Sequence, residues 1–307
     1  MTSGETKKVC NFATSVEAAG ERSTAPYAPI RRIHIHTTNT MKKILLTCAA
    51  CLAMLASCAQ KGEKAAALTE PATITWIADK PGTSLHPHSL FPGVPDSLWN
   101  ALGLQEGVPT SVSCFLLQVG ETNILLDTGL GAPFSQLGAR LADMGIAPET
   151  LRLIYLTHLH PDHIGGLLKD GQRVFPNATL YVNRVEAEAW LAMTDDASSR
   201  AKSVLEAYRD HLHLFEAGDT LDGGIVTIEA YGHTPGHTVF QKDSILVVGD
   251  LVHGGALQLV HPEYNAAYDM DAEAARQSRC RILDYARTHR LRIYGMHLPG
   301  PDPVVLE

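Results

Sequence analysis

Short apolar runs alternate with amphipathic stretches through residues 72–307, as expected of a protein that mixes strands and helices. Residues 73–77 alternate between polar and apolar positions, which predicts an edge strand. Residues 151–156 and 245–248 are mainly apolar, which predicts buried strands. Further strands are predicted at residues 112–119, 123–126, 179–182, 224–229, 238–241 and 291–294.

Helical spacing of the apolar residues appears between these strands. It predicts helices at residues 135–144, 163–168, 185–193, 197–211 and 272–288. Residues 81–109 are rich in proline and glycine, which predicts a loop. Because strands and helices alternate in two comparable halves, the pattern predicts an α/β protein built as a four-layer αββα sandwich, with helices outside two sheets.

The front of the chain has a different pattern. Met41 and two lysines precede a 12-residue apolar stretch, which is too short to span a bilayer and fits the core of a secretory signal. The stretch ends in Leu-Ala-Ser-Cys at Cys58, which resembles a bacterial lipoprotein signal box. The resemblance implies that residues 41–58 are a signal peptide and that Cys58 carries the lipid. The alternative is an ordinary signal peptide that contains a cysteine.

These features predict the organisation and the location of the chain. We expect an exported lipoprotein of the bacterial cell envelope, anchored to the membrane by its lipid. Residues 59–71 are predicted to be a tether and residues 72–307 the folded domain. Residues 1–40 are polar and lack periodicity. We expect them to be a start-site artefact or a disordered extension, with translation beginning at Met41.

The net charge of −8 is unevenly distributed. Residues 62–307 contain 17 basic and 30 acidic residues, so their net charge is −13. So acidic a domain is a poor partner for polyanions, which argues against nucleic acid as the substrate and favours a small molecule.

A dense group of polar side chains directly follows the apolar run at residues 151–156. It contains His158, His160, Asp162 and His163. Burying these groups without a cation is costly, because each imidazole and carboxylate then needs its own partner. Imidazole nitrogen and carboxylate oxygen are ligands that zinc prefers, so the pattern predicts a metal site rather than a solvated loop.

The segment 157–166 resembles the signature motif of the metallo-β-lactamase-fold hydrolases. Other positions resemble the remaining markers of that family: Asp127 in an early turn, the segment 232–237, Asp250 after a glycine, and His297 near the end. The surroundings of the last two look most like the methyl parathion hydrolase branch, which is close to the quorum-quenching lactonases.

The resemblance implies two divalent metal ions with seven protein ligands. The ligands divide into His158, His160 and His237 for one metal, Asp162, His163 and His297 for the other, and Asp250 as the bridge. Three protein ligands on a metal leave a position for water, as a catalytic zinc requires. Zinc is expected, although manganese, iron and cobalt accept the same nitrogen and oxygen ligands.

Three further residues receive supporting roles. Asp127 is predicted to orient a ligand imidazole. His233, four residues before His237, is predicted to support the turn rather than to bind metal. His253 is a candidate pocket residue, with simple packing after a strand as the alternative.

The sequence predicts a metallo-hydrolase that acts on an ester, a lactone or a phosphotriester. A water bridging two divalent ions would have its pKa lowered from ~15.7 to roughly 7, which makes hydroxide available at neutral pH. Asp162 or Asp250 would pass a proton to the leaving group. The alternatives are a β-lactamase of the same fold and a surface lipoprotein that binds metal without catalysis.

Overall fold

The computed structural model describes residues 70–307, and the structural statements below concern these residues. The predictions for residues 1–40, for the signal peptide 41–58 with Cys58, and for nearly all of the tether lie outside the described residues. Within residues 70–307, no helix is long and apolar enough to cross a membrane.

The first sheet has six strands and begins with two antiparallel pairs, after which the strands run parallel. In spatial order the strands are β1 (Ala72–Ala78), β4 (Ser113–Val119), β5 (Thr122–Leu126), β6 (Leu153–Tyr155), β9 (Thr179–Asn183) and β10 (Leu212–Phe215).

The second sheet has five strands, of which the last two are parallel. They are β11 (Thr220–Leu221), β12 (Ile225–Glu229), β13 (Thr238–Lys242), β14 (Ile245–Val247) and β15 (Arg292–Tyr294). Two small antiparallel strand pairs lie outside these sheets. They pair β2 (Ser84–His86) with β3 (Val108–Thr110) and β7 (Leu168–Lys169) with β8 (Gln172–Arg173).

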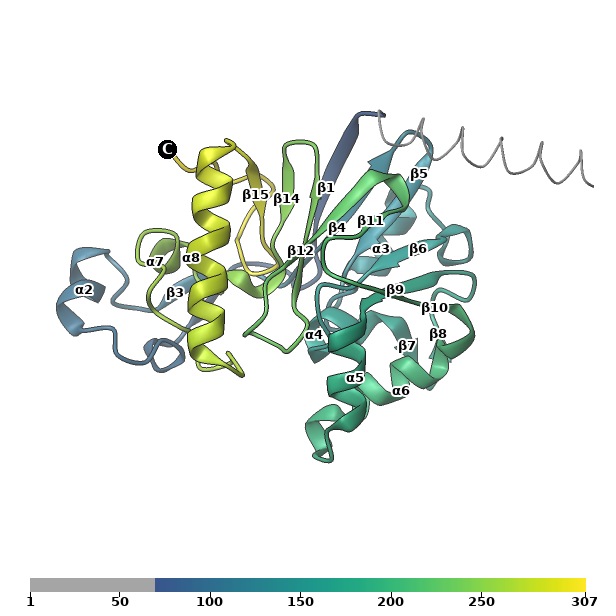
Figure 1. The fold of residues 1–307 in the computed structure, drawn as a ribbon, viewed down its shortest axis with the longest axis horizontal. Helices are drawn as coiled ribbons and strands as arrows, with labels where there is room; N and C mark the ends of the chain where they lie inside the picture. The colour runs from purple at the N-terminus through teal and green to yellow at the C-terminus, as the bar shows by residue number, and fades with distance from the viewer. Residues whose placement is uncertain (1–69) are drawn as a thin grey trace, which may run out of the picture. The chain divides into compact units, whose positions relative to one another are not determined.

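The helices lie on the outer faces of the two sheets (Figure 1). Those on the side of the first sheet are α3 (Leu137–Asp143), α4 (Pro161–Ile164), α5 (Arg184–Ala192) and α6 (Ser199–Ala207). The long helix α8 (Ala272–Thr288) covers the second sheet. Two short helices, α2 (Asp96–Ala101) and α7 (Gly255–Gln258), lie near the strand pair β2–β3.

Along the central strands, successive side chains point to opposite faces of the sheet. They contribute to one core between the two sheets and to one core under the helices on each outer face. In β4, Cys114 and Leu116 pack toward the helices, whereas Phe115 and Leu117 pack toward the second sheet. In β14, Leu246 packs toward α8 and its neighbours face the first sheet. Successive side chains of a strand point to opposite faces, so a strand that is apolar at every position must be covered twice. The predicted four-layer sandwich is confirmed.

Three predicted elements differ from the structure. The stretch 81–109 is not only loop, because it contains β2, α2 and β3 and forms an apolar cluster with α7. The helix predicted at 197–211 ends at Ala207 and is followed by a 3-10 turn at Arg209–His211 and by strand β10, which pairs with β9. The helix predicted at 163–168 is the short α4, and Gly165 and Gly166 then press against the backbone of the 128–130 loop.

Candidate metal centre

The predicted ligand residues lie in loops at the ends of strands. His158, His160, Asp162 and His163 follow β6, with the last two in α4. The remaining residues of the centre follow strands of the second sheet: His233 after β12, Asp250 after β14 and His297 after β15. The parallel pairs β5–β6 and β14–β15 therefore deliver their side chains from their carboxyl ends, where open α/β sheets commonly bind ligands.

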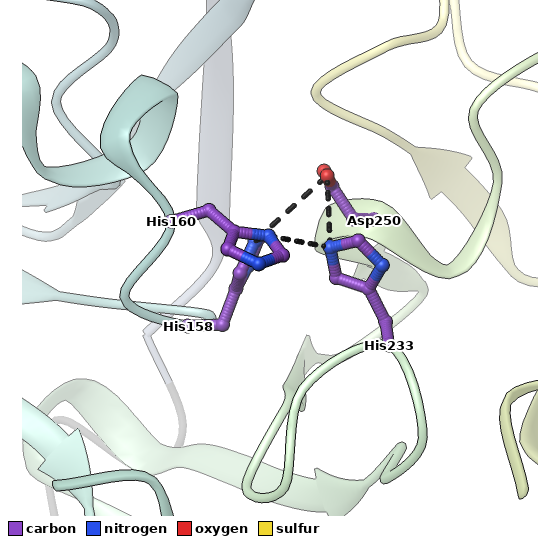
Figure 2. A group of neighbouring side chains, drawn as sticks. All are labelled: His158, His160, His233 and Asp250. Carbon is purple, nitrogen blue, oxygen red and sulfur yellow. Dashed lines mark hydrogen bonds and ion pairs between the residues drawn. The ribbon is translucent and has the colours of Figure 1, made fainter. Parts of the chain in front are cut away.

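The first group of donor atoms contains three histidines and Asp250 (Figure 2). His160 Nδ1 lies 3.0 Å from His158 Nε2 and 2.9 Å from His233 Nε2. Asp250 Oδ2 lies 3.3 Å from His233 Nε2 and 3.8 Å from His158 Nε2. The four donor atoms therefore converge on one point from two different sheets.

The second group contains Asp162, His163, Asp250 and His297. Asp250 Oδ1 lies 3.1 Å from His163 Nε2, and Asp250 Oδ2 lies 3.1 Å from His297 Nε2. Asp162 Oδ2 lies 3.5 Å from His297 Nε2 and 3.8 Å from His163 Nε2. Asp250 belongs to both groups.

The second ring nitrogen of several of these histidines is held by another group. Asp127 Oδ2 lies 2.6 Å from His163 Nδ1, Asp269 Oδ1 lies 3.0 Å from His233 Nδ1, and the Ser111 carbonyl lies 2.7 Å from His297 Nδ1. Each contact fixes the orientation of its ring and leaves Nε2 directed at the donor group, which is the usual arrangement around a ligand histidine.

Asp127 lies beside the ring of His163. It is fully buried after β5 with a φ of 57°, a left-handed conformation that few residues other than glycine adopt. Its carboxylate also accepts hydrogen bonds from the Thr157 backbone N–H at 2.8 Å and from the Thr157 hydroxyl at 2.7 Å. Asp127 thus connects the end of β5 to the loop that carries the first histidines.

The turn between β12 and β13 brings His233 rather than His237 to the first donor atoms. His233 lies in the first donor group, whereas both ring nitrogens of His237 are hydrogen-bonded to the backbone. His237 Nδ1 is 3.1 Å from the Ala230 carbonyl, and its Nε2 accepts a hydrogen bond from the Asp250 N–H at 3.1 Å. In this arrangement His237 positions the backbone of Asp250.

Gly249 allows this close contact. A Cβ at position 249 would lie 2.5 Å from His237 Nε2, and the φ of Gly249 is 53°. The Gly-Asp pair in the sequence thus reflects the approach of the His237 ring to the backbone. Which of the two histidines faces the donor group depends on the conformation of the turn, where Gly232 has a φ of 126°.

His253 is completely buried beside the centre. Its Nε2 lies 3.3 Å from Asp250 Oδ2, and its ring stacks on His297 with centroids 5.3 Å apart. The ring of Tyr268, which is 56% exposed, lies 5.9 Å from it. His253 therefore stands between the donor groups and the outer wall of the site.

Burial and charge set the protonation of the histidines. Burial, with neighbouring histidines, lowers the pKa of His160 to about 3 and holds the pKa of His158 well below its usual value. Burial would also lower the pKa of His233, but Asp250 and Asp269 outweigh it and raise that pKa to about 9. His158 and His160 are thus neutral, which is the form that binds a metal, whereas a metal bound at His233 must displace the proton of that ring.

The donor set fits divalent metal ions. Ligand atoms ~2.0–2.1 Å from a tetrahedral zinc lie about 3.4 Å apart, and the distances given above for pairs within the two groups range from 2.9 to 3.8 Å. Within the described residues, His163 Nε2 and Asp250 Oδ1 are buried and have no hydrogen-bond partner. Such atoms are costly to bury, and a cation bound between them would satisfy both.

Two carboxylates near the centre were not predicted from the sequence. Asp269 contacts His233 and lies 3.7 Å from the buried guanidinium of Arg279 on α8. Glu186 on α5 is fully buried behind the first histidines. Neither residue lies near a recognised motif, so their roles depend on contacts between elements that are distant in the sequence.

A cavity of about 600 Å³ lies elsewhere in the described part of the chain. Thr128, Gly165 and Gly166 contribute to its wall, which contains none of the donor residues. The Asp79 carboxylate in its wall already accepts hydrogen bonds from Leu130, Ser135 and Leu137. The Asp79 carboxylate is therefore satisfied by its own neighbours, and the cavity is separate from the donor residues.

Known proteins share sequence and fold with this chain. The model of the metallo-beta-lactamase superfamily matches residues 107–297, which is more than half of the chain. A solved structure, the hydrolase AbOPH of the beta lactamase superfamily, is similar with a TM-score of 0.68 and 30% identity. The similarity covers 76% of this chain and 89% of that one.

Two curated relatives are similar over shorter stretches. Exodeoxyribonuclease WalJ of Streptococcus pneumoniae is 29% identical over 123 residues, which are 40% of this chain and 41% of that protein. An N-acyl homoserine lactonase of Bacillus thuringiensis is 28% identical over 153 residues, 41% of this chain and 56% of that protein. The matches therefore span only about half of these relatives.

Proposed function

Because this chain belongs to the metallo-beta-lactamase superfamily, we propose that it is a hydrolase whose centre holds two divalent metal ions, with zinc the best match to the donor atoms. The observation that carries the proposal is the convergence of two donor groups on Asp250. The proposed ligands are His158, His160 and His233 for one ion, Asp162, His163 and His297 for the other, and Asp250 for both.

The bound ions would polarise a carbonyl or phosphoryl oxygen and lower the pKa of water to roughly 7. The protein supplies the proton carrier. The Asp162 side chain is 27% exposed, whereas Asp250 is 3% exposed and surrounded by histidines. Asp162 is therefore the carboxylate that a leaving group can reach, and we assign the proton transfer to Asp162 rather than to Asp250.

The surroundings of the centre favour a small ester or lactone. Tyr268 and Met270 are 56% and 51% exposed, and the Tyr268 ring lies 6.5 Å from His86 and 5.9 Å from His253. Such a wall suits an apolar substrate. The net charge of −13 in residues 62–307 disfavours DNA, in spite of the similarity to an exodeoxyribonuclease. The similarity to a lactonase supports the same substrate class.

Metal analysis combined with a substrate panel tests the proposal. We expect two ions per chain and hydrolysis of aryl esters or acyl homoserine lactones, lost on chelation and restored by zinc. Phosphotriesters belong to the panel as the third expected class, and DNA and a chromogenic β-lactam serve as comparisons. Hydrolysis of the β-lactam alone would favour the β-lactamase alternative. Two ions without turnover of any substrate would favour a metal-binding module.

A further inference from the structure

Glu186 is a buried carboxylate close to the donor groups but outside them. It lies in the first turn of α5, and its exposed fraction is 0%. None of the ion pairs within the described residues involves it, so its charge is not balanced by a neighbouring cation. Burial raises the pKa of Glu186, and hydrogen bonds from its neighbours oppose that shift. Burying a carboxylate costs free energy unless its contacts compensate for the lost hydration.

Those contacts join the two loops that carry the first donor group. Oε1 accepts hydrogen bonds from the Leu159 backbone N–H at 2.9 Å and from the Trp190 indole N–H at 2.6 Å. Oε2 accepts a hydrogen bond from the Gly236 backbone N–H at 2.7 Å. Leu159 stands between the first two histidines of the centre, and Gly236 lies in the turn that carries His233. One carboxylate therefore connects a loop of the first sheet to a turn of the second.

The neighbouring residues are shaped for this connection. A Cβ at Gly236 would lie 2.3 Å from the Glu186 backbone nitrogen, so α5 and the turn approach more closely than another residue would allow. Trp190, one turn after Glu186 on α5, meets the His160 ring edge-on with centroids 5.5 Å apart. The helix thus supports His160 through a ring contact and its loop through a hydrogen bond.

We propose that Glu186 is a positioning residue that holds the His158–His160 loop and the His233 turn together and thereby sets the affinity of the first metal group. The inference rests on the proposed metal-dependent function. In the second group, the rings of His163 and His297 are held by other groups, Asp127 and the Ser111 carbonyl. Loss of the Glu186 carboxylate should therefore weaken one metal and spare the other.

Glu186→Gln tests this inference without changing the size of the side chain. An amide group cannot accept hydrogen bonds at both ends, so it places a donor against the Gly236 N–H or against Leu159 and Trp190. We expect affinity for the first zinc ion to fall about 10- to 100-fold, as for loss of other supports of metal ligands. Titration of the full-length metal-free protein with zinc against a competing chelator measures both affinities and does not depend on hydrolysis.

Gly236→Ala provides a second route to the same effect, because its Cβ forces the turn away from α5 while the carboxylate stays in place. Gly138→Ala is the matched control, because nothing lies within 4 Å of a Cβ at that position of α3. The control should bind both ions as the unaltered protein does. If Glu186→Gln fails to fold, Gly236→Ala decides the question.

Selective loss of one zinc ion in these variants supports the inference. Unchanged affinity for both ions, or equal weakening of both, overturns it, since a merely structural residue would not distinguish the two groups. Failure of the unaltered protein to bind two ions would instead contradict the proposed function. The two failures are therefore distinguishable in one experiment.

Discussion

His233 and His237 come from one turn, but their ring nitrogens have opposite surroundings. His233 Nε2 faces the donor group, whereas both nitrogens of His237 bind backbone groups. We expect His233→Ala to lose the first metal and nearly all activity. His237→Ala removes only the support of Asp250, so metal affinity should fall about 10- to 100-fold. Zinc titration of both variants measures this difference. If His237→Ala lost the metal and His233→Ala kept it, the assignment would be contradicted.

Asp127 offers a test of the second metal group. Asp127→Asn retains the shape but places an amide against the Thr157 and His163 donors, which now share one acceptor oxygen. The His163 ring then loses the partner that directs Nε2 at Asp250. We expect affinity for the second zinc ion to fall about 10- to 100-fold, and affinity for the first ion, whose loop Asp127 holds only through Thr157, to fall less. The ion that is weakened more is the opposite of the one expected for Glu186→Gln, so the same titration checks both variants. Loss of the first ion alone in Asp127→Asn would refute this prediction.

The residues of the centre differ in how far the sequence could predict them. The positions of His158, His160 and His163 follow from one short loop after β6, so local spacing predicts their proximity. The choice between His233 and His237 depends on the turn that Gly232 permits, which the spacing of four residues does not specify. Glu186 and Asp269 act across elements that are distant in the sequence, and no motif marks them.

The position of Cys114 in strand β4 determines the burial of its thiol. Its residues are apolar at successive positions and pack alternately into two cores, so Cys114 is buried between the first sheet and its helices. Both Cys114 and Cys280 are free thiols, but Cys280 on α8 is only half-buried. Burial, together with the carboxylates of Asp79 and Asp127, holds the pKa of Cys114 well above its usual value.

A thiol reacts with alkylating reagents as its thiolate, so a buried cysteine with a raised pKa should be inert. We expect N-ethylmaleimide at pH 8 to label Cys280 but not Cys114 in the native protein. Both should be labelled in urea. Peptide mass mapping distinguishes these sites from the cysteines before residue 70. Equal labelling rates for Cys114 and Cys280 in the native protein would show that β4 is not covered on its helical side.

At the level of the whole fold, the four layers were predictable because several strands are apolar on both faces and alternate with helices in two halves. The short elements were not predictable. Strand β2 has three residues and α7 has four, and both take their shape from the apolar cluster that includes Phe91, Trp99 and Leu257. Tertiary packing rather than local pattern determines these segments, and they form one side of the site.

Residues 41–58, which precede the described residues, concern the location of the protein in the cell. We propose that the chain is exported and held at a membrane through a lipid on Cys58, because residues 41–58 combine a basic start, a short apolar stretch and a cysteine in the Leu-Ala-Ser-Cys context. Several acyl chains on one residue give stable anchoring, whereas the apolar stretch alone is too short to span a bilayer.

Cys58→Ser tests this proposal in bacterial cells. Acylation requires the sulfur of Cys58, so we expect the variant to move from the membrane pellet to the soluble fraction and to lose incorporation of labelled fatty acid. Cys51→Ser is the matched control, because it removes a cysteine from the same apolar stretch and should leave both readouts unchanged. Fractionation after a high-salt wash separates lipid anchoring from charge-based adsorption. A Cys58→Ser protein that stays in the washed pellet and still incorporates fatty acid would refute the assignment of Cys58.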